Sequence, residues 1–289
     1  ARGTALIITA GVFWGSMGIF VRALGKYGLS SIQIVCLRLT VAAVVFAALH
    51  AVLERDKLWI SPRDIPLFLG LGLGSILFFT VCYFTAINMM PLSTAAILLY
   101  TSPIWVMLMS CVFFREKLSV KKLCALACAF GGCVLVSGLS RGGLSVLGLL
   151  IGLGSGIGYG LYSILGSVAL RKYETLTVTT YAFLFSAVGS WFICRPAEML
   201  SIASSLPPLS FALDVLSIAV VTAVAPYLLY TLGLKNTPAS KAAIMATVEP
   251  LVATVLGIVV FSEPLTPAAA AGIILILAAI VLLNAHRKE

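Results

Sequence analysis

The chain has 289 residues, of which 61% are hydrophobic and only 10% charged, and its mean hydropathy is +1.13. A soluble globular domain is nearer half apolar and a quarter charged, and one core of this size cannot hide so much apolar surface, so the composition excludes a soluble protein. The net charge of +9 does not indicate nucleic-acid binding, because the basic residues gather at the ends of apolar stretches and not on one face or arm.

Apolar runs bounded by charges or turn residues predict ten membrane-spanning helices, since a span needs about 20 apolar residues. In chain order we expect them at 3–21, 31–53, 65–88, 91–114, 122–139, 144–170, 175–194, 210–234, 241–261 and 265–284. The longest connection is 195–209. The first run is expected to remain as a helix and not to be a signal peptide. The predicted fold class is an all-α integral membrane protein with the lipid bilayer as its surroundings.

The distribution of Lys and Arg predicts the orientation of the spans. With the N-terminus inside, 14 of the 19 basic residues fall in inside segments, one (Arg38) lies within a span, and four fall outside: Arg22, Lys26, Arg141 and Arg195. Cytoplasmic segments carry such an excess in membrane proteins. We therefore expect both termini in the cytoplasm and the protein in a plasma membrane, the inner membrane in the case of a bacterium.

The sequence also repeats itself at a spacing of 147 residues. Several uncommon residues coincide without a gap: Tyr83 with Tyr230, Pro91 with Pro238, Ser93 with Ser240, Ala95-Ala96-Ile97 with Ala242-Ala243-Ile244, Pro103 with Pro250, and Glu116 with Glu263. Shared apolar composition does not align prolines, glutamates and a serine in register. The pattern predicts an internal duplication, with halves at 1–139 and 144–289.

Each predicted half has five spans, so the second half must enter the membrane from the opposite side. The charges agree, because the connection at 115–122 is basic while its counterpart at 262–269 contains no Lys or Arg. Inverted repeats of this kind are the architecture of secondary transporters, whose substrate site lies at the repeat interface near the membrane midplane. The expected function is transport of a small molecule by alternating access.

The residues also suggest a family. Trp14-Gly15-Ser16, Arg38, the segment from Pro91 to Ile97, Thr101-Ser102-Pro103, Glu116, Pro238-Ala239-Ser240, Glu249-Pro250 and Glu263 occur in order over nearly the whole chain. In this respect the chain resembles the EamA-like branch of the drug/metabolite transporter superfamily. The resemblance implies a 5+5 inverted-repeat transporter of small metabolites, often an exporter of amino acids or related compounds. Where Trp14 stands in the first half, the second half has Tyr159.

Two ionisable residues lie well inside predicted spans, where a charge is costly: Arg38 and Glu249. Arg38 is either a clamp for the substrate or a structural residue that snorkels outward or bonds helix-end carbonyls. Glu249 is either a site for a proton or a substrate amine, or a residue that bonds a neighbouring helix. If Glu249 binds and releases a proton between conformational states, transport is coupled to protons.

Aromatic side chains provide the remaining candidates for a substrate cavity, because their faces suit cations and planar solutes. We include Trp14, Tyr83, Tyr100, Trp105, Tyr159, Tyr162, Tyr227 and Tyr230. Trp14 and Tyr159 are expected deepest, while Tyr83 and Tyr230 suit an interfacial belt or a gate equally well. Pro103 and Pro250 are related by the repeat and are expected to kink their spans around the cavity. Glycines at every fourth position from Gly148 to Gly160, with Gly11 and Gly15, predict close helix packing.

Two other functions compete with transport: a membrane-embedded enzyme, and a structural or signalling scaffold. An enzyme needs a nucleophile, a base or a metal set, but the histidines, His50 and His286, lie near span ends and the sequence has no HExxH or GxSxG motif. A scaffold needs no inverted duplication. The sequence predicts no enzymatic activity, no cofactor and no metal, and a small-molecule substrate as the partner.

Overall fold

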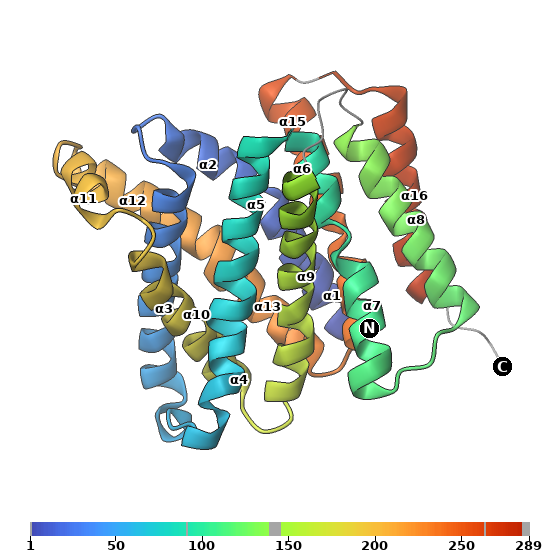
Figure 1. The fold of residues 1–289 in the computed structure, drawn as a ribbon, viewed down its shortest axis with the longest axis horizontal. Helices are drawn as coiled ribbons and strands as arrows, with labels where there is room; N and C mark the ends of the chain where they lie inside the picture. The colour runs from blue at the N-terminus through green and yellow to red at the C-terminus, as the bar shows by residue number, and fades with distance from the viewer. Residues whose placement is uncertain (1, 91, 139–145, 263, 285–289) are drawn as a thin grey trace.

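The computed structural model describes residues 2–90, 92–138, 146–262 and 264–284, and this part of the chain is helical, without a β-strand (Figure 1). The predicted all-α membrane fold is thereby confirmed. Four residues used in the sequence analysis lie outside the described residues: Pro91, Arg141, Glu263 and His286. The expected boundary between the halves, at residues 139–144, also lies outside them.

The helices group into ten spans, numbered along the chain. Spans 1 to 5 are α1 and α2 (Arg2–Gly15 and Met17–Gly25), α3 (Ser31–Leu53), α4, η3 and α5 (Ile65–Leu69, Gly70–Leu77 and Phe78–Met89), α6 and α7 (Leu92–Leu99 and Ser102–Phe114), and α8 (Val120–Ser137). Spans 6 to 10 are α9 (Val146–Ala169), α10 (Thr175–Trp191), α12, η4 and α13 (Pro208–Ala219, Val220–Val224 and Ala225–Leu234), α14 and α15 (Ala239–Ala246 and Val248–Phe261), and α16 (Pro267–Asn284). The connections contain η1 (Arg55–Lys57), η2 (Pro62–Asp64) and α11 (Pro196–Ser204).

Within the described ranges, nine of the ten spans are long and apolar enough to cross a bilayer. Span 7 is shorter, because α10 has 17 residues, which is the lower limit for a span. The sequence analysis expected this helix to reach residue 194 and a loop to follow it. Instead the chain leaves the span after Trp191, and α11 turns away from α10 by 93°. Arg195 has a left-handed backbone (φ 51°) and Pro196 cannot continue the preceding helix, which explains the turn.

Side-chain caps fix where two of the spans begin. The backbone N–H of Ser30 donates to Gln33 Oε1 (2.8 Å), and Gln33 N–H donates to Ser30 Oγ (3.3 Å), which is a capping box at the start of α3. Ser119 Oγ accepts from the N–H of Lys122 (3.2 Å) at the start of α8. These polar caps satisfy backbone donors that the membrane does not satisfy.

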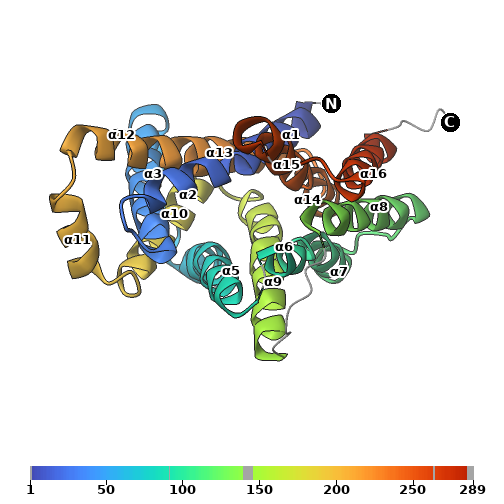
Figure 2. The same cartoon turned by 90° about the horizontal axis from the view of Figure 1, so that it is seen from above.

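Each half of the chain packs mainly against the other half. Span 1 packs against spans 8 and 9, and span 6 packs in the same way against spans 3 and 4. Spans 2 and 7 pack together, as do spans 4 and 9 and, at one edge of the bundle, spans 5 and 10 (Figures 1 and 2). A twofold axis produces this pairing, because each of the contacts named here has a counterpart with the halves exchanged. The inverted 5+5 repeat expected from the sequence therefore describes the fold.

Local backbone features recur at the same 147-residue spacing. Helices α7 and α15 are each followed by a left-handed residue, Arg115 (φ 53°) and Ser262 (φ 55°). Spans 3 and 8 each contain a π-helical segment, η3 and η4, and the two segments end at the repeat-related residues Leu77 and Val224. Spans 4 and 9 are each broken into two helices. The symmetry thus extends to details that the apolar pattern does not show.

The two ends of the bundle differ in charge. The connections 54–64, 115–119, 170–174 and 235–238 lie at one end, the lower side in Figure 1, and carry 8 of the 19 Lys and Arg residues. We call this the basic end. The start of α1 and the finish of α16 also lie there, since Thr4 Oγ1 donates to Asn284 Oδ1 (3.4 Å). At the other end, which we call the opposite end, the described connections contain the basic residues Lys26 and Arg195.

Spans 5 and 10 meet at a glycine crossing that yields a testable prediction. A Cβ atom at Gly132 would lie 2.8 Å from the carbonyl oxygen of Gly272, whereas one at Gly131 would have its nearest neighbour, in Leu275, at 3.9 Å. Gly132→Ala is therefore expected to lower the Tm in detergent by roughly 2–10 °C, because it forces the two backbones apart. The matched variant Gly131→Ala should leave the Tm unchanged or raise it slightly, since Ala is the better helix former. Equal Tm values for the two variants would contradict this packing.

Candidate functional site

A cavity of about 360 Å³ lies between the two halves of the chain. We call it the central cavity; spans 1, 2, 3, 4, 6, 8 and 9 contribute to its wall. Its deep end is at Trp14, Tyr159 and Glu249, and its rim at the opposite end includes the exposed residues Arg22 and Ser31. The inverted repeat predicts a cavity between the two halves, and the structure has one there.

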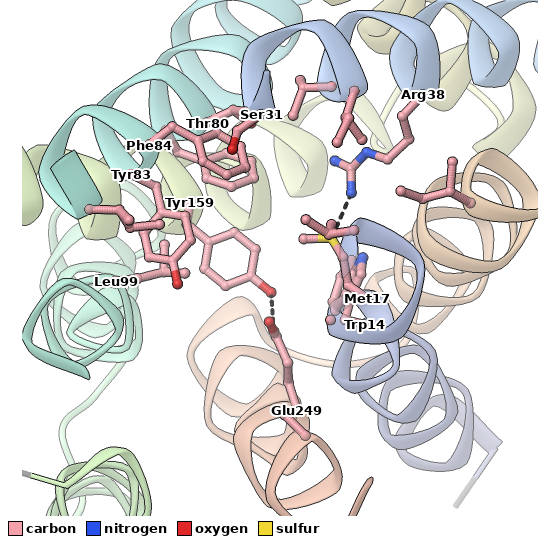
Figure 3. Close-up of a pocket in the computed structure, with 18 of the residues that line it drawn as sticks. Trp14, Met17, Ser31, Arg38, Thr80, Tyr83, Phe84, Leu99, Tyr159 and Glu249 are labelled. Carbon is pink, nitrogen blue, oxygen red and sulfur yellow. Dashed lines mark hydrogen bonds between the residues drawn. The ribbon is translucent and has the colours of Figure 1, made fainter. Parts of the chain in front are cut away.

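The central cavity brings together most of the predicted site residues (Figure 3). Seven line it: Trp14, Arg38, Tyr83, Tyr100, Tyr159, Tyr227 and Glu249. Tyr162 and Tyr230 lie nearer the basic end, below the cavity. Trp105 lies outside it, and its indole Nε1–H donates to Thr101 Oγ1 (3.1 Å) in the preceding turn. Trp105 therefore has a local partner and no place in the cavity wall.

Glu249 lies in the first turn of α15, directly after the break in span 9. Its carboxyl group faces the central cavity, and Oε2 accepts a hydrogen bond from the phenol of Tyr159 (2.9 Å, Figure 3). Acidic groups are favoured in the first helical turn, where unpaired N–H groups point outward. No ion pair joins Glu249 to Arg38, although both face the same cavity. The carboxyl group is thus positioned by a phenol, and one side of it is left to the cavity.

Arg38 lies in the N-terminal third of α3 and is 4% exposed. Its Nη1 is 2.9 Å from the sulfur of Met17 and 3.5 Å from Thr222 Oγ1, and its Nε–H has no hydrogen-bond partner. A guanidinium has five donors, a thioether is a weak acceptor, and 3.5 Å is long for a hydrogen bond. This buried cation is therefore poorly satisfied by the protein, so an anionic group in the cavity would gain strong hydrogen bonds there.

Trp14 is the centre of an aromatic cluster at the deep end of the cavity. Its ring centroid lies 5.2 Å from that of Tyr227, 5.3 Å from that of Tyr230 and 6.0 Å from that of Tyr159, with edge-to-face or tilted geometry. Phe79 adds a further contact to Tyr159, at 5.2 Å. Gly11 and Gly15, one turn apart on span 1, let this helix approach the backbone of span 9 at Ala246 and Glu249. Close packing thus holds Trp14 and Glu249 at the same depth, as the glycine pattern predicts.

Below the aromatic cluster the passage toward the basic end is closed by side chains of spans 6 and 8. The hydroxyls of Tyr162 and Thr231 are 2.8 Å apart, and those of Ser163 and Tyr230 are 2.7 Å apart. All four residues, which we call the closed gate, are almost fully buried. The space beside them is only about 20 Å³, and Trp14 lies above it. A solute in the central cavity therefore cannot reach the basic end in this conformation.

Two ion pairs at the basic end connect the two halves beyond the closed gate: Lys57 with Glu174, and Lys172 with Asp64. Lys235 also pairs with Glu174, within the second half. The hydrogen bond from Lys235, followed by its charge, lowers the pKa of Glu174, and Lys57 adds to the effect. The carboxyl group of Glu174 is therefore ionised in this conformation. Such exposed pairs contribute little individually, about 0–1 kcal/mol each, but the two that join the halves favour closure of this end.

The two predicted kinks occur where the repeat places them. Span 4 is interrupted between α6 and α7, and span 9 at Thr247, each within three residues before its proline, Pro103 or Pro250. Both prolines lie at the N-terminal end of the second helix, where a missing N–H costs nothing. The break in span 9 turns Glu249 toward the cavity.

Several cavity and gate residues were not identified from the sequence. Met17 contacts Arg38, Phe79 packs on Tyr159, and Thr222 lies in the π-helical segment η4. Ser163 and Thr231 complete the closed gate. Small hydroxyl residues are common in membrane helices, so their presence alone carried no information.

Comparison with known proteins agrees with this architecture. The sequence model of the EamA-like transporter family matches residues 1–138 and 146–285. An uncharacterized transporter of Archaeoglobus fulgidus is 29% identical, covering 97% of this chain and 95% of that protein, and the uncharacterized transporter YwfM of Bacillus subtilis is 24% identical, covering 98% and 94%. A crystal structure with 20% identity has the same fold, with a TM-score of 0.81 over 98% of this chain and 96% of that chain. The match over both halves shows that the chain is a membrane protein of the EamA-like transporter family.

Proposed function

We propose that this protein is a secondary transporter or facilitator that moves small amphiphilic metabolites, amino acids or related compounds, through the central cavity by alternating access. One observation carries the proposal. A cation with an unused hydrogen-bond donor, Arg38, and the carboxyl group of Glu249 both face one cavity that is walled by aromatic rings. A cavity of about 360 Å³ falls in the range of small-molecule sites.

The arrangement of charges favours a substrate that carries both a carboxylate and an amine. A carboxylate would receive hydrogen bonds from Arg38, and an ammonium group would face Glu249 and the rings of Trp14 and Tyr159. Arg38 and Glu249 come from spans 2 and 9 and do not neutralise each other through an ion pair. A zwitterion satisfies both at once, whereas a simple amine or a simple acid leaves one of them unpaired.

Two features support alternating access. The central cavity reaches the opposite end, while hydroxyl pairs and ion pairs close the basic end. The inverted repeat provides a second conformation of comparable energy, in which the halves exchange their roles and the cavity opens at the basic end. The excess of Lys and Arg supports a cytoplasmic basic end with both termini there, in a plasma membrane. Export is the direction that the family resemblance suggests.

The test is ligand-dependent thermal stabilisation of the purified protein, because a compound that binds the folded state raises the Tm by mass action. The panel contains amino acids, each with its decarboxylated amine and its deaminated acid. We expect the zwitterions to raise the Tm most. Arg38→Gln should abolish the preference for the zwitterion over its amine, and Glu249→Gln the preference over its acid. A panel in which no zwitterion exceeds both of its analogues would refute the proposed substrate class.

A further inference from the structure

The repeat assigns a counterpart to each residue of the closed gate. Glycine contacts fix the alignment of spans 1 and 6. On span 1, Gly11 faces the carbonyl oxygen of Ala246 and Gly15 faces that of Glu249. On span 6, Gly156 faces the carbonyl oxygen of Leu99 and Gly160 faces that of Ser102. The carbonyl partners are 147 residues apart, whereas the glycines are 145 apart. Spans 1 and 6 are therefore related by 145 residues, and spans 3 and 8 by 147.

With these two offsets the closed gate corresponds to four residues on the other side of the aromatic cluster. Tyr162 and Ser163 correspond to Met17 and Gly18 on span 1, and Tyr230 and Thr231 correspond to Tyr83 and Phe84 on span 3. All four counterparts line the central cavity on the side of the opposite end. A Cβ atom built at Gly18 would have nothing within 4 Å, whereas Ser163 is hydrogen-bonded and 4% exposed. The counterpart of the closed gate is thus open in this conformation.

We propose that Met17, Gly18, Tyr83 and Phe84 form a second gate, which closes the central cavity toward the opposite end when the closed gate opens. The proposal rests on the alternating access proposed above. On closure Met17 and Gly18 approach Phe84 and Tyr83 as Tyr162 and Ser163 now approach Thr231 and Tyr230. We call these four residues the outer gate.

The chemistry of the two gates differs, and the difference sets the resting conformation. The closed gate holds two buried hydroxyl pairs, Tyr162 with Thr231 and Ser163 with Tyr230. The outer gate can offer one hydroxyl, that of Tyr83, and it has no side-chain partner at Gly18. Each hydrogen bond shifts a two-state population by a factor of about 2 to 10. Without substrate the protein therefore favours the conformation that the structure shows.

Met17 connects the outer gate to the substrate site. Its sulfur is the nearest partner of Arg38, at 2.9 Å from Nη1. An anionic group on Arg38 would replace this weak acceptor with a strong one and release the Met17 side chain toward Phe84. A ligand shifts a conformational equilibrium only through its differential affinity for the two states, and this contact provides such a difference.

The experiment measures how often the closed gate opens. In a background without the seven native cysteines, Ala243→Cys places a thiol in the small space beside the closed gate, at a residue that is 7% exposed. The rate of maleimide labelling in detergent then reports the fraction of protein in which this gate is open. Gly18→Ser supplies the missing partner for Tyr83 and should raise the labelling rate about 2- to 10-fold. Gly18→Trp places an indole where Tyr83 must close and should lower the rate at least about twofold.

Gly25 provides the matched control for Gly18. Both glycines lie on α2, and a Cβ atom built at either has nothing within 4 Å. Unlike Gly18, Gly25 does not line the cavity. Gly25→Ser and Gly25→Trp should leave the labelling rate unchanged, and all four variants should keep the parent Tm within a few degrees. Opposite shifts for the two Gly18 variants establish the outer gate. Equal rates for Gly18→Ser and Gly25→Ser, or no decrease for Gly18→Trp, would overturn it. The labelling assay needs no substrate. If the thermal-stabilisation panel refutes the proposed substrate class, the labelling result still stands, and if the labelling rates overturn the outer gate, the panel result still stands.

Discussion

Replacing Trp14 with Ala is expected to lower substrate uptake into proteoliposomes about tenfold or more, the largest effect we expect from any single aromatic residue. Trp14 contacts three tyrosines and separates the central cavity from the closed gate. The truncation removes a face of the substrate site and also leaves a void above the hydroxyl pairs. The compound to measure is the one that gives the greatest thermal stabilisation of the unmodified protein.

Two variants separate this effect from a loss of folding. Trp105→Ala removes an indole of equal size that lies outside the cavity and bonds only Thr101, so its uptake should stay within about twofold of the parent. Trp14→Phe keeps a ring and should retain part of the activity, with the loss mainly in KM. If Trp14→Ala and Trp105→Ala transport equally well at equal protein content, Trp14 is not part of the transport site.

Glu249→Gln is expected to abolish substrate accumulation driven by a pH gradient while preserving exchange of labelled for unlabelled substrate. Glutamine keeps the shape and the hydrogen bond with Tyr159 but cannot exchange a proton. A carboxylate costs more to enclose than a carboxylic acid, so closing the cavity favours proton binding and opening it to water favours release. Six charged or titratable groups surround Glu249: Arg38 on span 2, Tyr83 on span 3, Tyr100 on span 4, Cys133 on span 5, Tyr159 on span 6 and Tyr227 on span 8.

The comparison variant is Tyr159→Phe, which keeps the carboxyl group and removes only its hydrogen bond. It should still accumulate substrate along a pH gradient, with a shifted pH optimum. Unchanged rate and unchanged pH dependence in Glu249→Gln would assign Glu249 to packing and make the protein a facilitator. Loss of both accumulation and exchange would instead indicate that the carboxylate is needed for binding the substrate amine.

The sequence predicted the frame of this molecule because that frame depends on apolar length and on identities that recur in register. Pro103 with Pro250 and Tyr83 with Tyr230 are among the identities that predicted the repeat, and the five spans in each half predicted its inversion. The depth of each residue in the membrane was harder to predict. Tyr162 shares a helix face with Tyr159, and Tyr230 shares one with Tyr227. Tyr162 and Tyr230 nevertheless lie one turn nearer the basic end, beyond the central cavity. A helical pattern gives direction around the axis, but the closing point of a cavity depends on which neighbours fill it.

Other parts of the site had no sequence pattern to predict them. The offset changes from 147 residues in spans 3 and 8 to 145 in spans 1 and 6, so a single alignment does not pair Ser163 with Gly18. The contact of Arg38 with Met17 depends on the approach of span 1 to span 2, and periodicity does not encode it. The turn at Pro196 lay within a segment expected to be a loop, where one short helix changes little in composition.

The π-helical segments η3 and η4 have a consequence for the history of this chain. A π-helical turn holds an additional residue, and each residue turns an α-helix by about 100°. Deleting one residue from Gly70–Leu77 would rotate Tyr83 and Phe84 away from the cavity, and a deletion in Val220–Val224 would do the same to Tyr230 and Thr231. The two segments end at residues that the repeat aligns, Leu77 and Val224. The additional residue is therefore most simply explained as already present in the ancestral five-helix gene before that gene duplicated. Insertions and deletions that persist among descendants should therefore fall in the connections and not in spans 3 and 8.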